Sequence, residues 1–205
     1  MAVSIVVGLA VGIISSLKPN SLLDRGTMFL ALTGISAPVF WVGLLLILII
    51  GVNLKWLPPI GYGGVEYLIL PAITLGTRSA AFLARITRAT MLDVLQQDYI
   101  RTARAKGLPE WKVVLKHAFP NTLIPVITII GVDFGSYLSG AVLTESIFGW
   151  PGIGRFALDA ILKRDFPVIQ GTVLFAAMMF ILANLIVDLL YGVVDPKVRL
   201  ERSNG

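Results

Sequence analysis

The ionisable side chains of this 205-residue chain are concentrated in one stretch, DYIRTARAKGLPEWKVVLKHAFP, which runs from Asp98 to Pro120. It contains the single histidine, His117, and the chain has no cysteine. Disulfides, thiolate metal sites, cysteine nucleophiles and histidine-based metal clusters are therefore excluded. With one histidine there is also no Ser-His-Asp or H-E-x-x-H arrangement. We therefore predict that the segment serves binding, that His117 is a polar residue of an amphipathic helix, and that the chain is not an enzyme.

The local pattern predicts two short helices joined by a turn. Asp98–Lys106 consists of good helix formers, and Gly107 suits the C′ position that follows a helix. Pro109 suits the first position of a second helix, where Glu110 complements the helix dipole. The second helix is expected to carry one apolar face, made of Leu108, Trp111, Leu115 and Ala118. Its basic residues, Lys112 and Lys116, lie on another face.

Three kinds of binding fit such a segment. The first is contact with anionic lipid headgroups, and the second is binding of nucleic acid. The third is docking of a soluble protein, with force passed into the attached parts of the chain. Nucleic acid is the least favoured, because no set of base-stacking residues accompanies the basic ones.

The rest of the chain has the composition of a polytopic membrane protein. Apolar residues make up 56% of it and charged residues only 14%, whereas about 25% is charged in soluble domains. A helix needs about 20 residues to cross the hydrocarbon core. Five apolar runs are predicted as spans, of which the first is short: about 1–17, 28–51, 67–91, 121–144 and 167–191. Proline and glycine within them, Pro38 included, permit kinks.

Basic residues are distributed unevenly over the two sides that these spans define. The loop 17–27, the stretch 85–119 and the tail 192–205 hold twelve, and the other side holds Lys55, Arg155, Lys163 and Arg164. The positive-inside rule therefore predicts that the first side, with the C-terminus, is cytoplasmic.

Two further features are candidates for a functional role. Arg78 and Asp133 fall at mid-span depth, where charge is costly and faces a partner or a watery cavity. Structural pairing of the two is favoured over a place along a path. On the outer side, GWPGIGRF (149–156) is either a tight turn or an outer gate that meets another protein. The candidate gate residues are Phe148, Gly149, Trp150, Pro151, Gly152 and Gly154.

Several strings resemble one known family. The segment from Arg101-Thr102-Ala103 through Gly107 and His117 to Phe119-Pro120 is similar to the EAA loop of bacterial ABC importer permeases. The strings YIRTARAKG, LKHAFPNTLIPVIT, TESIFGWPGIGRF, LLYGVVDPKVR and GISAPVFWVGLLLILI resemble the peptide/nickel branch of that family. The resemblance covers nearly the whole chain. Family members usually carry one more N-terminal span, so the chain is expected to be a shortened or mis-started version.

The resemblance implies an all-α fold, the transmembrane domain of a type I ABC importer, over residues 1–195, with a cytoplasmic tail at 196–205. It implies a coupling loop over about 92–120 that docks a cytosolic ATPase. The residues implied in coupling are Tyr99, Arg101, Thr102, Ala103, Arg104, Lys106, Gly107, Trp111, Leu115, His117 and Pro120. The implied partners are a second permease, two ATPases, an extracytoplasmic binding protein and membrane lipid, with no nucleic acid.

No phosphate-binding loop G-x-x-x-x-G-K-[ST] occurs, so ATP and Mg²⁺ are expected on the partner ATPases and no cofactor on this chain. The expected location is the inner membrane of a bacterium or archaeon, and the expected cargo is a peptide, nickel or a related small solute. An ion-gradient-driven transporter or channel fragment is the alternative, and a structural membrane subunit is a third.

Overall fold

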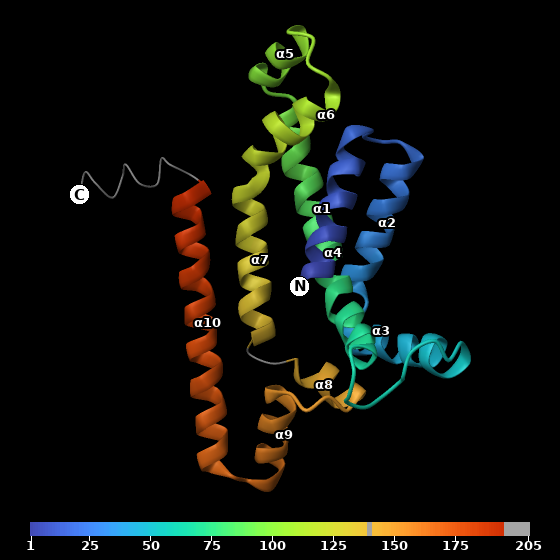
Figure 1. The fold of residues 1–205 in the computed structure, drawn as a ribbon, viewed down its shortest axis with the longest axis vertical. Helices are drawn as coiled ribbons and strands as arrows, with labels where there is room; N and C mark the ends of the chain where they lie inside the picture. Colours follow the sequence, from blue (N-terminus) through green and yellow to red (C-terminus); the bar gives the residue numbers. More distant parts are fainter. Residues whose placement is uncertain (139–140, 195–205) are drawn as a thin grey trace, which may run out of the picture.

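The computed structural model describes residues 1–138 and 141–194, and all regular secondary structure in those ranges is helical (Figure 1). This confirms the predicted all-α class. The α-helices are α1 (Ala2–Leu17), α2 (Leu22–Ser36), α3 (Val39–Leu46), α4 (Glu66–Leu95), α5 (Asp98–Ala105), α6 (Glu110–Lys112), α7 (Leu123–Leu138), α8 (Val142–Phe148), α9 (Ile153–Lys163) and α10 (Phe166–Val194). Helix α3 continues as π-helical turns through Ile47–Asn53. Helix α6 continues through π-helical turns Val113–Ala118 and a 3₁₀ turn Phe119–Thr122 into α7.

Three helices are long and apolar enough to cross a membrane: α4, the continuous helix Glu110–Tyr137, and Phe166–Leu189 within α10. The bent pair α2–α3 adds a fourth if it counts as one span. Helix α1 has 16 residues, which at 1.5 Å each is about 24 Å and shorter than a hydrocarbon core of roughly 30 Å. By length and composition, the described residues therefore give three or four span candidates, where the sequence predicted five spans.

The predicted span 28–51 is not one straight helix. Helices α2 and α3 meet at an angle of 105°, and α3 lies across the end of the bundle (Figure 1). Ala37 and Pro38 at the junction are both extended, with ψ of 131° and 132°. The reason is local: proline disfavours the helical conformation of the preceding residue and cannot donate a backbone hydrogen bond. Pro38 therefore ends α2 and turns the chain.

Small residues let α1 and α4 pack closely. Ser4, Gly8, Gly12 and Ser16 repeat every four residues along α1, and all four are buried. A Cβ atom at Gly8 would lie 2.9 Å from the Ala80 carbonyl oxygen, so this position tolerates only glycine without a shift of the helices. Close backbone approach of this kind holds membrane helices together through van der Waals contact.

Helix α10 stands at the edge of the bundle and packs on α7 and α9 (Figure 1). Gly131 of α7 faces Val187, and Gly135 of α7 faces Phe180. Much of the remaining surface of α10 is exposed and apolar, as is much of α2. Apolar residues that face outward are expected of helices surrounded by lipid.

Candidate functional site

The charged stretch 98–120 forms one end of the bundle, beyond the end of α4 (Figure 1). Helix α5 follows α4 after two residues, and the helix that begins at Glu110 runs on into α7 without a break. Between them Gly107 adopts φ of +75°, the left-handed conformation expected at this position. Pro109 is extended and caps the second helix, which starts one residue later than the sequence indicated. The predicted helix–turn–helix is therefore present and joins two helices that are long and apolar enough to cross a membrane.

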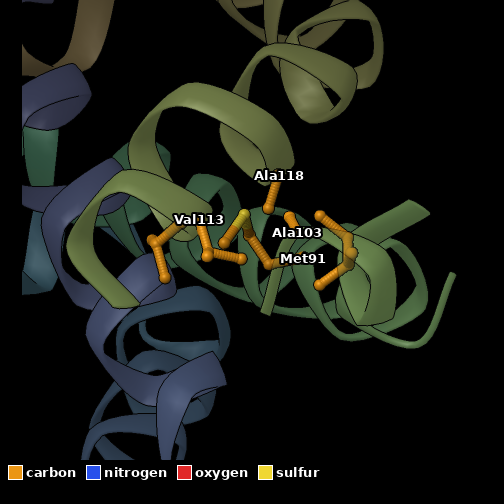
Figure 2. Close-up of a cluster of buried hydrophobic side chains, with 6 residues drawn as sticks. Met91, Ala103, Val113 and Ala118 are labelled. Carbon is orange, nitrogen blue, oxygen red and sulfur yellow. The ribbon is translucent and has the colours of Figure 1, made fainter. Parts of the chain in front are cut away.

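A cluster of buried apolar side chains holds this segment against α4 (Figure 2). Met91 near the end of α4 lies between Ala103 of α5 and Val113 of the next helix, and Ile100 and Ala118 belong to the same cluster. Ile100, Val113 and Ala118 are fully buried. Because these contacts tie α5 and the 110–118 helix to α4, a displacement of the segment is passed to the membrane helices as movement of one packed unit.

The apolar face predicted for the second helix divides into two. Ala118 is buried in the cluster and Leu108 packs at its edge, whereas Trp111 is 63% exposed and Leu115 53% exposed. The difference has a structural cause. Residues 113–118 form π-helical turns, in which residues five apart, rather than four apart, lie one above the other. Val113 and Val114 thereby replace Trp111 and Leu115 on the inner side, and two large apolar residues face outward.

The exposed tip therefore combines apolar and basic side chains. Tyr99 is also exposed, and the Lys112 ammonium lies 5.4 Å from the centre of the Trp111 ring. The exposed basic and neighbouring residues are Arg101, Thr102, Arg104, Lys106, Lys112, Lys116 and Pro120. His117 is half-buried, and Ala103 is buried in the cluster. Of the predicted coupling residues, Ala103 therefore holds the segment in place, while most others are available to a partner.

An ion pair closes the turn at Gly107. The Arg104 guanidinium donates to both carboxylate oxygens of Glu110, with Nη2–Oε1 2.6 Å and Nε–Oε2 3.1 Å. The carboxylate raises the pKa of Arg104 above its already high ordinary value, so this side chain stays charged. Exposed pairs contribute little stability, typically under about 1 kcal/mol, but a bidentate pair fixes geometry. It therefore sets the angle between α5 and the helix after the turn.

The GWPGIGRF loop lies at the opposite end, between α8 and α9 (Figure 1). Phe148 is buried beside Gly43 of α3. Gly149 adopts φ of +65°, and the Trp150 ring meets Tyr62 edge to face with centroids 5.1 Å apart. Pro151 and Gly152 form the turn into α9, and Gly154 is buried in the first turn of that helix. The six predicted residues are thus brought together, as a loop packed against the segment 54–65.

Glu145 organises this loop and was not among the predicted residues. Its Oε2 accepts from the backbone N–H of Arg155 (2.7 Å) and thereby caps the start of α9. Its Oε1 accepts from the N–H of Ala141 (3.3 Å). A Cβ atom at Gly152 would lie 2.2 Å from the Glu145 carboxyl carbon, which explains the glycine. The sequence signal was the acid three residues before the aromatic–glycine pair Phe148-Gly149.

Arg78 and Asp133 do not form an ion pair with each other or with any other part of the described chain. The favoured structural pairing is therefore not present. Arg78 is exposed on α4 and Asp133 is half-buried on α7. Near them, the Tyr137 hydroxyl of α7 donates to the Leu75 carbonyl oxygen of α4 (2.9 Å).

A different ion pair joins three helices. The Arg88 guanidinium of α4 donates from Nε (2.6 Å) and Nη2 (2.7 Å) to the two carboxylate oxygens of Asp24 on α2. Asp24 is nearly fully buried and also accepts from the Ser15 hydroxyl of α1 and the Asn20 backbone N–H (2.7 Å). Sequence reasoning counted Arg88 only as a topology signal and gave Asp24 no role.

Comparison with known proteins identifies the family of this chain. A family model described as "Binding-protein-dependent transport system inner membrane component" matches residues 8–200. The chain belongs to this family. Its members are membrane components of transport systems and not enzymes, and they bind no cofactor themselves, as the sequence predicted.

Relatives of this binding-protein-dependent component are similar to it over nearly the whole chain, as two examples show. The di/tripeptide transport system permease protein DppB of Pseudomonas aeruginosa is 46% identical, with 95% of this chain and 66% of the relative covered. The glutathione transport system permease protein GsiC of Pectobacterium atrosepticum is 49% identical, covering 97% and 65%. The chain thus spans just under two thirds of the length of the curated relatives it matches.

A solved structure shows the same fold. An inward-facing crystal form of the MetNI methionine ABC transporter matches with a TM-score of 0.74 and 17% identity, over 94% of this chain and 88% of that chain. This confirms the predicted transmembrane fold of an ABC importer.

Proposed function

We propose that this chain is the permease subunit of an ATP-driven importer of short peptides, located in a bacterial inner membrane. The observation that carries the proposal is the exposed tip formed by Tyr99, Trp111 and Leu115, held rigidly to two membrane-crossing helices. Relatives named as di/tripeptide, dipeptide and glutathione permeases support the cargo class, with nickel or a related small solute as the wider range.

The tip serves as the docking site for a cytosolic ATPase. Large exposed aromatic residues are frequent anchors at protein interfaces, and basic residues around them suit an acidic rim on the partner. When the ATPase moves the tip, the buried cluster around Met91 transmits the movement to α4 and α7 together. Anionic lipid near the tip is contacted by the basic residues that surround it. The coupling loop is thus assigned to residues 92–120, within a transmembrane domain over 1–195.

The remaining partners follow from this arrangement. A second permease subunit completes the membrane domain, a second ATPase docks its tip, and an extracytoplasmic binding protein meets the loop 148–154. The side that holds residues 98–120 is cytoplasmic, and so is the C-terminal tail 196–205, which lies outside the described residues. Tyr62 and Trp150 stiffen the outer loop, so that it presents one fixed surface to the binding protein.

Uptake of a labelled dipeptide tests the proposal against an ion-gradient transporter. The complex that contains this chain, together with its binding protein, is reconstituted into proteoliposomes. We expect uptake that requires ATP on the side of residues 98–120 and that survives collapse of the ion gradients by ionophores. Uptake without ATP that stops on addition of ionophores would contradict the proposal, and so would complete indifference to dipeptides.

A further inference from the structure

Arg78 and Asp133, which form no ion pair within the described residues, lie at similar depth on the neighbouring helices α4 and α7. Arg78 precedes Ser79 on α4, and the Ser79 hydroxyl shares a hydrogen bond with the Tyr137 hydroxyl of α7. Asp133 lies four residues, or one helical turn of about 6 Å, before Tyr137. The contact between Ser79 and Tyr137 therefore brings Arg78 and Asp133 to within about one turn of the same level.

A cavity of about 380 Å³ adjoins this level on the outer side. Its walls come from α4, α7, α8 and the outer loop, and include Leu75, Phe134, Tyr137, Thr144, Glu145 and Trp150. The Tyr137 hydroxyl also donates to the Leu75 carbonyl oxygen (2.9 Å), so Tyr137 closes the cavity on the side toward the cytoplasmic tip. Neither Arg78 nor Asp133 lines the cavity; Arg78 adjoins Ser79 on α4, and Asp133 lies one turn before Tyr137 on α7.

Charge at this depth needs a partner. An arginine or aspartate in the middle of a membrane helix is costly unless it meets an opposite charge or water. Arg78 is exposed and forms no ion pair within the described chain, and the same holds for the half-buried Asp133. By contrast, Arg88 of α4 donates hydrogen bonds to both carboxylate oxygens of Asp24 on α2. The unpaired Arg78 and Asp133 side chains together suit a ligand that carries one negatively and one positively charged group.

We propose that Arg78 and Asp133 form a dipolar binding site for the two charged ends of a short peptide as it passes Tyr137. Asp133 takes the terminal ammonium group and Arg78 takes the terminal carboxylate. A guanidinium binds a carboxylate through two parallel hydrogen bonds, which adds orientation to the attraction. The assignment rests on the proposed function, because only an importer of peptides places such a ligand here.

The reconstituted uptake assay separates the outcomes. Asp133→Asn keeps the side-chain size, Arg78→Gln shortens the side chain but keeps it polar, and each removes one charge. Arg85→Gln makes the same change at a different arginine of α4 and is the matched control. We expect at least tenfold slower uptake of a free dipeptide by the first two variants and less than a twofold change for the control. Assembly with the other subunits and ATP hydrolysis without binding protein stay within twofold of wild type.

A dipeptide amide identifies the partner of Arg78. The amide lacks the carboxylate, so Arg78→Gln should slow its uptake by less than twofold relative to wild type, whereas Asp133→Asn should still slow it. Each variant is compared with wild type for the same peptide, so the preference of the binding protein cancels.

Three results would overturn the proposal: uptake of the free dipeptide within twofold of wild type, an equal loss for peptide and amide in Arg78→Gln, or loss of subunit assembly in either variant. The last would assign the charges to a subunit contact. A wild-type complex that transports no dipeptide would instead contradict the proposed function itself.

Discussion

Replacing Asp24 by asparagine removes the charge at the centre of the α1–α2–α4 junction. The Asp24 carboxylate accepts two hydrogen bonds from Arg88, one from Ser15 and one from the Asn20 backbone. Asparagine retains one acceptor and turns an N–H group toward the guanidinium. Removing one partner of a buried ion pair costs about 3–5 kcal/mol. The Arg88 side chain is 23% exposed and keeps some hydration, so we expect the lower end, about 3 kcal/mol.

Thermal unfolding of the purified complex measures this effect. A loss of about 3 kcal/mol lowers the melting temperature of a chain of this size by roughly 6–12 °C. Asp93→Asn is the matched control, because Asp93 is exposed on α4 and forms no ion pair within the described chain; it should shift the melting temperature by less than about 2 °C. In Asp24→Asn with Arg88→Leu, the loss should be smaller than the sum of the single losses, because the uncompensated charge is gone. A shift under about 2 °C for Asp24→Asn, or strict additivity, would refute this account of the junction.

Three further changes test the fold and the turn. Gly107→Val should weaken ATPase binding, because the left-handed conformation at this position costs about 1–2 kcal/mol for residues other than glycine. Gly107→Asn should bind the ATPase normally, because asparagine tolerates that conformation. Equal ATPase binding by the two variants would contradict a need for positive φ at residue 107. Gly12→Val should reduce the yield of folded protein several-fold, because its Cβ would lie 2.7 Å from a backbone oxygen of α4, whereas Gly26→Val has open space and should express normally. If both express alike, α1 does not depend on this close approach. Cysteines at Glu110 and Asp159 should be labelled from opposite sides of the membrane, and labelling from one side would overturn the topology.

Composition and hydrophobic run length predicted much of the fold. The bounds of α4 and α10 lie within a few residues of the predicted spans, because a helix that crosses lipid must be long and apolar. The bend at Pro38 was foreseeable as a kink, but its angle of 105° depends on the packing of α3 against α4 and α8. Similarly, Gly107 marked the turn, because positive φ strongly favours one residue type.

Contacts between residues far apart in the chain could not be predicted from the sequence pattern. Asp24 and Arg88 are 64 residues apart, and neither spacing nor residue type links them. The outward position of Trp111 also escaped prediction, because helical periodicity assumes a regular α-helix and residues 113–118 are π-helical. Conversely, the sequence favoured an ion pair between Arg78 and Asp133, because a charged side chain in lipid is energetically unfavourable. In the described part of the chain, neither residue forms an ion pair.

The docking role of the cytoplasmic tip is tested most directly by two tryptophan variants. Trp111 at the tip and Trp56 at the opposite end are both exposed, at 63% and 73%, so their loss removes similar surface. Truncating an aromatic anchor costs at least about 2 kcal/mol, which is roughly thirtyfold in affinity. Affinity of the purified ATPase for the nanodisc-embedded permease is the measurement. We predict at least thirtyfold weaker binding for Trp111→Ala and an unchanged affinity for Trp56→Ala; equal affinities for the two variants would contradict the account.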